Sequence, residues 1–279
     1  MMLSGEARLA GVMGWPVAHS RSPRLHGYWL QQHGIDGAYL PLAVHPENLP
    51  DALGALPVLG FAGCNLTIPH KEAALDLVGE VTPLAARIGA INTVTVKADG
   101  TLLGDNTDAY GFMENLRAEA PEFDPADGPA VVLGSGGAAR AVCAGLIAAG
   151  IKDIILLNRT QERAEKLAAD MGAEVRIQPW SGRDAALNDA ALLVNTTSLG
   201  MSGQPALEFD LSQLPSDAVV SDLVYSPLRT ALLGAAGARG NRTVGGLGML
   251  LHQARPGFAA WFGVDPDVTP ELHQIVAGG

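Results

Sequence analysis

Short apolar runs alternate with helix-like segments along most of this chain. Strands that alternate with helices form largely parallel sheets joined by crossovers, so the pattern predicts an α/β fold. Residues 91–106 add a hairpin that turns at Asp99-Gly100 between apolar positions. In the first half of the chain, the other expected strands are residues 7–14, 38–44 and 61–68, and the expected helices are residues 22–33, 46–56 and 71–79.

The strongest local signal is the segment AVVLGSGGAARAV, residues 130–142. A β-branched run stops at Gly134-Ser135-Gly136-Gly137, and an alanine-rich run that favours a helix begins directly afterwards. The order of strand, glycine turn and helix presents bare backbone N–H groups and a helix N-terminus to a phosphate. The alternative is that these glycines only form a tight turn between strand and helix.

A second expected strand, residues 154–157, follows after one helix length and ends at Asn158-Arg159-Thr160. In a dinucleotide-binding unit this strand end faces the adenosine ribose. An acidic residue there would favour NAD by bonding the 2′-hydroxyl, whereas arginine suits a 2′-phosphate. The sequence therefore predicts that the chain binds NADP.

Further elements surround this unit. A connecting helix is expected over residues 108–119, followed by a loop rich in proline and glycine at residues 121–129. Strands are expected at residues 191–197 and 218–225. The segment that begins near Asn241 predicts a glycine turn, a helix, a loop and a second helix.

A chain of 279 residues with 48% hydrophobic and 17% charged residues is long enough for two globular domains. Its formal net charge of −11 argues against nucleic-acid binding, which needs a basic surface.

Cys64 and Cys143 lack the spacing of metal ligands or of a redox pair. We expect each to pack as a small hydrophobic side chain, in a protein of a reducing compartment. The N-terminal segment contains Glu6 and Arg8 and lacks a sustained apolar run, so we expect no signal peptide and a cytoplasmic protein. No membrane span is expected, because charged residues interrupt the most apolar region, residues 138–157.

Polar clusters follow several of the expected strands, where ligands collect in open α/β sheets. In GWPVAHSRSP, Ser20 and Ser22 are spaced so that both hydroxyls can hold one carboxylate. Alternatively, Ser22 is the N-cap of the helix that opens at Pro23.

A lysine follows the strand at residues 61–68 in the segment NLTIPHK. Lys71 is positioned by rigid backbone after a proline, and a desolvated lysine suits acid/base chemistry. The alternatives are a solvated Lys71 in a first helical turn and His70 as the acid/base group, although a lone histidine here is more often a packing residue.

Two further polar residues, Asn92 and Asp108, follow later expected elements. Asn92, in GAINTV, offers a donor and an acceptor to a hydroxylated substrate. Asp108, in GDNTDAYGF, could orient the lysine and exchange protons with a substrate hydroxyl. Asn106, Thr107 and Asp108 are also all suited to cap the helix that follows. The histidines show no metal-ligand spacing and no G-x-S-x-G segment is present, so we expect neither a metal site nor a serine hydrolase.

These segments, together with NTTSLGM, DLVYSP and GGLGMLLHQA, resemble in this order the shikimate dehydrogenases, NADP-dependent enzymes that reduce 3-dehydroshikimate in aromatic amino-acid biosynthesis. The resemblance runs from about Gly11 to Gly263. It implies that Lys71 and Asp108 are catalytic. It implies substrate contacts by Ser20, Ser22, Asn65, Thr67, Lys71, Asn92, Asp108, Tyr225 and Gln253. It implies cofactor contacts by Gly134, Ser135, Gly136, Gly137, Ala138, Asn158, Arg159, Thr160, Arg163, Leu223, Gly246 and Met249.

The chain departs from the family pattern at a few positions. Gly27 follows His26 where the family usually has asparagine, and Ser135 stands where the glycine loop often has alanine. Pro83 replaces a common acidic residue after the catalytic lysine, so that position is left out of the expected site. None of these changes affects Lys71 or Asp108.

The resemblance implies a two-domain α/β architecture with a cleft between the domains. Residues 1–106 and 240–279 would form the substrate-binding domain, and residues 107–239 would form a Rossmann-type NADP domain. The alternatives are a quinate/shikimate dehydrogenase that often uses NAD, and a non-catalytic paralogue that senses shikimate or nucleotide. The expected partners are the small-molecule substrate and NADP, without nucleic acid or membrane, in a monomer or a homodimer.

Overall fold

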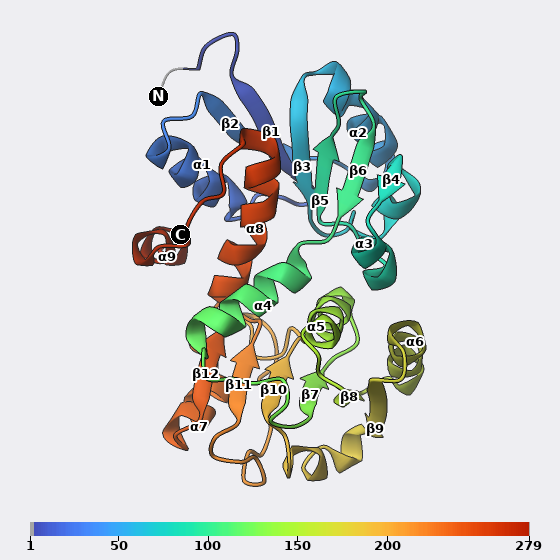
Figure 1. Cartoon of the computed structure of the whole chain (residues 1–279), viewed down its shortest axis with the longest axis vertical. Helices are drawn as coiled ribbons and strands as arrows, with labels where there is room; N and C mark the ends of the chain where they lie inside the picture. Colours follow the sequence, from blue (N-terminus) through green and yellow to red (C-terminus); the bar gives the residue numbers. More distant parts are fainter. Residues whose placement is uncertain (1–2, 279) are drawn as a thin grey trace. The chain divides into compact units, whose positions relative to one another are not determined.

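The computed structural model describes residues 3–278, which form two compact units that each contain a six-stranded sheet (Figure 1). The first unit joins the residues up to Thr107 to those from Gln253 onward, and the second runs from Asp108 to His252. The predicted return to the first domain at residue 240 is therefore too early. Arg242–Gly245 is a strand, β12, which pairs in parallel with its neighbour in the second sheet. The sequence hides this strand because it is short and has a single buried apolar side chain, Val244.

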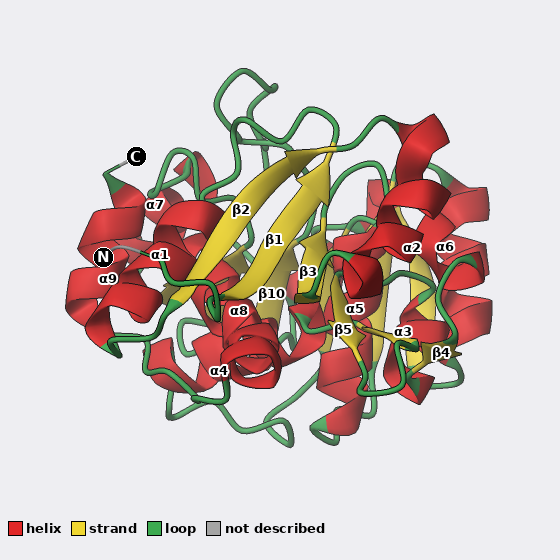
Figure 2. Ribbon diagram, turned by 90° about the horizontal axis from the view of Figure 1, so that it is seen from above, coloured by secondary structure: helices red, strands yellow, loops and turns green. Residues whose placement is uncertain are grey.

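The first unit has a mixed sheet with the strand order β2-β1-β3-β5-β6-β4. Figure 2 shows its strands β2, β1 and β3 as neighbours. Strands β2 and β3 are parallel to β1, whereas β5 is antiparallel to β3. Strands β5 and β6 are antiparallel, as the predicted hairpin requires. The strands are β1 (Arg8–Gly14), β2 (Gly37–Ala43), β3 (Phe61–Leu66), β4 (Glu80–Val81), β5 (Thr93–Val96) and β6 (Leu102–Asp105). The helices are α1 (Ser22–Gln32), α2 (Leu49–Val58), α3 (Pro83–Ile88), the end of α8 (Gly246–Phe262) and α9 (Pro270–Ala277), with 3₁₀ turns at Pro46–Asn48 and Ala73–Asp76.

Two separate clusters of side chains pack within this unit. Leu49, Leu53 and Leu56 of α2 pack in one buried cluster with Met13 of β1 and Leu66 of β3. An aromatic cluster lies elsewhere in the unit and is drawn from α1, β2 and α8. Its rings are His26, Trp29, Tyr39, Phe258 and Trp261.

Gly63 lets the aromatic cluster reach the sheet. Its φ of +156° is one that L side chains rarely adopt, and a Cβ there would lie 2.2 Å from the indole nitrogen of Trp261. Without that Cβ, the Trp261 indole donates a hydrogen bond of 3.0 Å to the carbonyl of Val94. Any other residue at position 63 would displace Trp261 from this bond.

The helix predicted over residues 71–79 does not form, and only the 3₁₀ turn at Ala73–Asp76 is present. An α-helix would use the carbonyl of Lys71 to accept the amide of Leu75. That carbonyl instead accepts the amide of Ile91 at 2.7 Å, and the amide of Leu75 donates to Glu72 at 3.2 Å. A tertiary bond to the segment before β5 therefore replaces the helical one.

The second unit has an all-parallel sheet with the strand order β12-β11-β10-β7-β8-β9. Read from the other edge, this order is that of the doubly wound dinucleotide-binding fold. Its strands are β7 (Ala130–Leu133), β8 (Ile154–Asn158), β9 (Val175–Pro179), β10 (Leu192–Asn195), β11 (Val219–Asp222) and β12 (Arg242–Gly245). Its helices are α4 (Asp108–Glu119), α5 (Gly137–Ala148), α6 (Gln161–Met171), α7 (Ala231–Ala238) and the start of α8, with 3₁₀ turns at Trp180–Gly182 and Ala185–Leu187.

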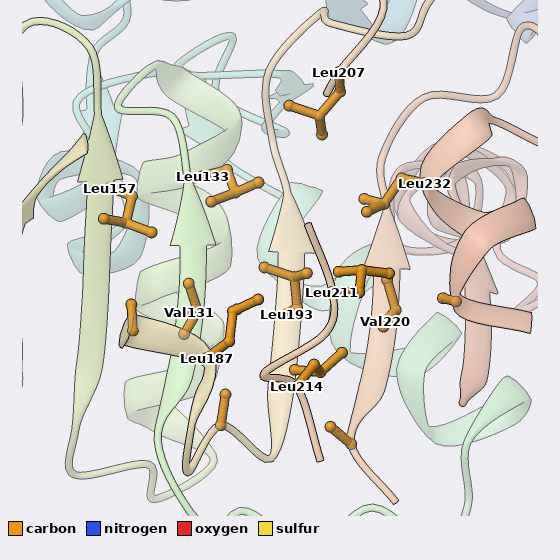
Figure 3. Close-up of a cluster of buried hydrophobic side chains, with 14 of the residues drawn as sticks. Val131, Leu133, Leu157, Leu187, Leu193, Leu207, Leu211, Leu214, Val220 and Leu232 are labelled. Carbon is orange, nitrogen blue, oxygen red and sulfur yellow. The ribbon is translucent and has the colours of Figure 1, made fainter. Parts of the chain in front are cut away.

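Strand β7, at the centre of the second sheet, is apolar throughout. Every residue of β7 is fully buried, which is typical of a parallel strand covered on both faces. Figure 3 shows Val131, Leu193 and Val220 pointing toward leucines of the loops and helices around them. Among residues 3–278, no helix is both long and apolar enough to cross a membrane.

His26 makes the first unit sensitive to pH. The ring is fully buried, and neither ring nitrogen has a hydrogen-bond partner. Burial lowers the pKa of His26 from 6.5 to about 3, against a smaller opposing effect of the nearby Asn65. Because the folded protein resists protonation here, His26 contributes its full stability above pH 6.5 and loses it as the pH falls.

We predict that the free energy of unfolding falls by about 1 kcal/mol between pH 6.5 and 5.5 because of this one ring. In His26→Phe, which keeps an aromatic ring, this part of the slope should disappear in urea titrations at each pH. His19→Gln, which removes an exposed ring, is the matched control. An equal slope in wild type and His26→Phe would contradict the prediction.

Candidate active site

The segment after β1 lies against the segment after β3. The amide of Thr67 donates to the carbonyl of Met13 at 3.0 Å, and the amide of Trp15 donates to the carbonyl of Ile68 at 3.1 Å. A Cβ on Gly14 would meet the methyl carbon of Thr67 at 2.5 Å, so only glycine allows this approach. Thr67 is thereby fixed beside the start of the segment that carries the serine pair.

The two serines form the entry to α1. The hydroxyl oxygen of Ser20 accepts the amide of Ser22 at 3.3 Å. The helix begins at Ser22, and its N-cap residue is Arg21, which makes no side-chain capping bond. The alternative that Ser22 caps the helix is therefore wrong. Ser22 is buried and Ser20 is half-buried.

Lys71 is half-buried and tied to the segment before β5 through its carbonyl, which accepts the amide of Ile91 at 2.7 Å. The neighbouring His70 is only 1% exposed, and its Nε2 atom bonds to the carbonyl of Val44 at 2.9 Å. This geometry gives His70 a packing role and leaves Lys71 as the candidate proton-transfer group. His70 and Lys71 are neighbours in the sequence, but they contact different segments of the unit.

Asn92 is the centre of a buried polar network, which we call the Asn92 network. Its Oδ1 atom accepts the amide of Thr107 at 2.8 Å and the hydroxyl of Thr93 at 2.9 Å. Its Nδ2 atom donates to Oε1 of Gln253 at 3.2 Å, and its carbonyl accepts Nδ2 of Asn65 at 3.0 Å. The network brings together the ends of β3 and β6, the start of β5 and the residue Gln253 of α8.

Asn65 is 6% exposed and is held on three sides. Besides the bond to Asn92, its Nδ2 atom donates to the hydroxyl of Thr93 at 3.2 Å. Its Oδ1 atom accepts the hydroxyl of Tyr39 at 2.6 Å. Both amide hydrogens of Asn65 are therefore used within the protein.

Asp108 is the first residue of α4 and follows directly on Thr107 of the Asn92 network. The structure places Ser20, Ser22, Asn65, Thr67, Lys71, Asn92 and Gln253 in the first unit. The second unit holds Asp108, Tyr225 and all of the expected cofactor residues.

The glycine segment of the second unit has the geometry of a phosphate cradle. Gly134 has a φ of +105°, and a Cβ there would lie 2.8 Å from Oγ1 of Thr196. Gly136, the N-cap residue of α5, and Gly137 face open space, because a Cβ on either would meet nothing within 4 Å. The first amides of α5 are thus bare, and these residues fit the pyrophosphate of a dinucleotide.

The end of β8 lies at the same sheet edge, because β7 and β8 are parallel neighbours. Nδ2 of Asn158 donates to the carbonyl of Thr160 at 2.7 Å and shapes the turn into α6. The side chains of Arg159 and Arg163 are exposed beside this turn. Two exposed guanidinium groups, one before α6 and one in its first turn, fit a 2′-phosphate, which supports NADP rather than NAD.

A buried carboxylate organises the turn after β11, and sequence reasoning missed it. Asp222 accepts Nδ2 of Asn195 at 2.9 Å, the amide of Val224 at 3.1 Å and the hydroxyl of Thr230 at 2.6 Å. Burial raises the pKa of Asp222, and these hydrogen bonds oppose the rise. The only sequence signal is the position of Asn195 and Asp222 at the carboxyl ends of adjacent strands.

This turn carries Leu223 and Tyr225, which are both half-buried. Gly246, at the start of α8, packs so closely on it that a Cβ would lie 2.1 Å from the carbonyl oxygen of Leu223. Met249 follows one turn later and is also half-buried.

In the described part of the chain, no group of three or more His, Cys, Asp or Glu side chains is placed to hold a metal ion.

Three family models match the chain. Residues 12–94 match the shikimate dehydrogenase substrate binding domain, residues 119–202 match shikimate/quinate 5-dehydrogenase, and residues 246–270 match the shikimate 5′-dehydrogenase C-terminal domain. The chain is 61% identical to a shikimate dehydrogenase (NADP⁺) of Paramagnetospirillum magneticum, covering 98% of this chain and 99% of the relative.

Two solved structures show the same fold. Shikimate 5-dehydrogenase from Thermus thermophilus, in complex with NADP(H) and shikimate, is 40% identical with a TM-score of 0.85, and 98% of each chain is covered. Quinate dehydrogenase from Corynebacterium glutamicum, in complex with NAD, is 32% identical with a TM-score of 0.90, covering 98% of this chain and 99% of the other.

The doubly wound second sheet, the bare glycine cradle and the polar centre of the first unit define a two-domain, nucleotide-dependent α/β dehydrogenase. Within that class, the sequence matches are decisive. The chain belongs to the shikimate dehydrogenase family.

The two glycine environments predict opposite outcomes for the same substitution. Gly136→Ala should leave the melting temperature unchanged, because its Cβ enters open space, but should raise the Kd for NADP⁺ about tenfold by obstructing the approach of a phosphate. Gly134→Ala should cost about 1–3 kcal/mol of stability through backbone strain. Calorimetric titration and thermal melting measure both effects. Unchanged NADP⁺ binding by Gly136→Ala would contradict the assignment of this loop.

Proposed function

We propose that this chain is an NADP-dependent shikimate dehydrogenase that interconverts 3-dehydroshikimate and shikimate, with Lys71 as the proton-transfer residue. The observation that carries the proposal is the convergence of four sequence motifs on one place. The segments that contain Thr67 to Lys71, Asn92, Thr107 and Gln253 are joined by the hydrogen bonds of the Asn92 network and by the bond from Ile91 to Lys71.

The substrate has one carboxylate and several hydroxyls, and the proposed site divides these between two kinds of group. The hydroxyls of Ser20 and Ser22, one next to the other at the entry to α1, hold the carboxylate. Lys71, Asn92 and Asp108 bind the ring hydroxyls, and Thr67, Tyr225 and Gln253 complete the contacts. A few local donors must hold this anion against a net protein charge of −11.

Reduction adds a hydride to the C3 carbon of 3-dehydroshikimate and a proton to its oxygen. NADPH supplies the hydride when it is bound. Lys71 stabilises the negative charge that develops on the C3 oxygen and donates the proton to it. Asp108 bonds to the same oxygen and fixes its orientation. In the reverse direction, Lys71 accepts the proton from the C3 hydroxyl.

Two features favour this function over its alternatives. The exposed Arg159 and Arg163 fit the 2′-phosphate of NADP, and the serine pair is more similar to a shikimate-type pocket than to a quinate-type one. A non-catalytic sensor would be expected to lack Lys71 or Asp108, and both residues are present. We also place the protein in the cytoplasm, since Cys64 and Cys143 are buried and unpaired, which suits a reducing compartment.

The proposal predicts a specific loss of rate in Lys71→Ala. Because Lys71 acts on the transition state, kcat for shikimate oxidation should fall by about 10²–10⁴-fold with little change in KM. The absorbance of NADPH follows the rate. Lys97→Ala, which removes an exposed lysine paired with Glu80 in the same unit, should leave both constants unchanged. A mainly raised KM in Lys71→Ala would give Lys71 a binding role instead.

A further inference from the structure

Tyr39 is a buried residue of the first unit and takes no part in the proposed reaction. It is 7% exposed and stands on β2, opposite Ala10 of β1. Its hydroxyl nevertheless reaches Asn65, which is on β3, on the other side of β1. The small Ala10 side chain is fully buried beneath this crossing.

The phenol ring is held in a fixed plane. It stacks on His26 with ring centroids 3.9 Å apart and planes inclined by 4°. The ring of Trp261 also packs against the Tyr39 ring, with ring centroids 6.0 Å apart. Burial raises the pKa of Tyr39 well above its usual value, an effect that the Cys64 thiol strengthens and the Ser22 hydroxyl opposes. Tyr39 therefore stays protonated and donates its hydrogen.

The acceptor of this hydrogen is the side-chain amide of Asn65, whose orientation must be fixed. A primary amide can turn by 180° and exchange its oxygen and nitrogen. The Tyr39 hydroxyl, a donor here, fixes the oxygen of Asn65 toward β2 at 2.6 Å. The nitrogen of Asn65 must then face the carbonyl of Asn92 and the hydroxyl of Thr93. In the flipped orientation, an oxygen would face the carbonyl of Asn92 and repel it.

We propose that Tyr39 is a positioning residue of the substrate pocket, which fixes the orientation of Asn65 and thereby the place of Asn92. This inference rests on the proposed function, because Asn92 is assigned there to the substrate hydroxyls. Tyr39 does not touch the reacting atoms. The proposed effect passes through two hydrogen bonds, from its hydroxyl to Asn65 and from Asn65 to the backbone of Asn92. The Ser22 hydroxyl also acts on the Tyr39 hydroxyl, and an effect through Ser22 would be independent of Asn65.

The test is Tyr39→Phe, which keeps the ring stacked on His26 and removes only the hydroxyl. We expect KM for shikimate to rise about tenfold, with KM for NADP⁺ unchanged. A variant that merely lost stability would show a smaller active fraction and unchanged KM values. Tyr28→Phe, which removes a surface hydroxyl bonded to Glu271 in the same unit, is the matched control and should behave as wild type.

A double-mutant cycle separates action through Asn65 from any other effect. If Tyr39 acts through Asn65, the variant Tyr39→Phe/Asn65→Ala should be no worse than Asn65→Ala alone. Additive effects, or an unchanged KM in folded Tyr39→Phe, would overturn the inference. Should Tyr39→Phe not fold, Asn65→Asp serves instead. It can still accept from Tyr39 but cannot donate to Asn92, so an unchanged KM there would also overturn the inference.

The same assay distinguishes this inference from the proposed function. Wild-type turnover of shikimate with NADP⁺ together with an unaltered Tyr39→Phe would refute the positioning role alone. Folded wild-type protein that turns over no shikimate would refute the proposed function, and the positioning role with it.

Discussion

The side-chain amide of Asn92 is the interaction on which the polar centre of the first unit depends. Its oxygen and nitrogen reach Thr93, Thr107 and Gln253, which come from separate parts of the chain. A buried polar group left without partners costs about 1–3 kcal/mol, so each of these bonds constrains the others. Thr107, the last residue of the first unit before α4, is held by its amide in this way. The chain therefore leaves the first unit toward Asp108 from a fixed point.

In the second unit, a buried polar side chain likewise holds a turn in place, at the carboxyl ends of the strands. Asp222 accepts bonds from Asn195, Val224 and Thr230, and so fixes the turn that carries Leu223 and Tyr225. In the glycine segment after β7, the close approach of Thr196 to Gly134 plays the corresponding part. In both units, buried hydrogen bonds or close backbone approaches hold in place the loops that bear the candidate site residues.

Much of this arrangement follows from the sequence, for reasons that differ among its parts. The strand, glycine turn and helix at β7 and α5, the β5–β6 hairpin and the bounds of α4 were predictable because local pattern and turn chemistry agree there. The segment after Lys71 was not, because a tertiary bond from Ile91 replaces the helical one. Tyr39 read simply as a strand residue, since its link to Asn65 passes across an intervening strand. The pattern of apolar and polar residues along the sequence does not reveal a contact between side chains on strands that are not adjacent.

Fold alone does not select the substrate or the cofactor, since the NAD-bound quinate dehydrogenase structure superposes with a TM-score of 0.90 and the NADP(H)-bound shikimate dehydrogenase with 0.85. In the proposed function, the choice rests on the serine pair at the entry to α1 and on Arg159, directly after β8. The most direct test is a matrix of initial rates with shikimate or quinate against NADP⁺ or NAD⁺. The account predicts a clear preference for shikimate with NADP⁺. Turnover of quinate would contradict the serine-pair assignment, and a preference for NAD⁺ would contradict the phosphate site at Arg159.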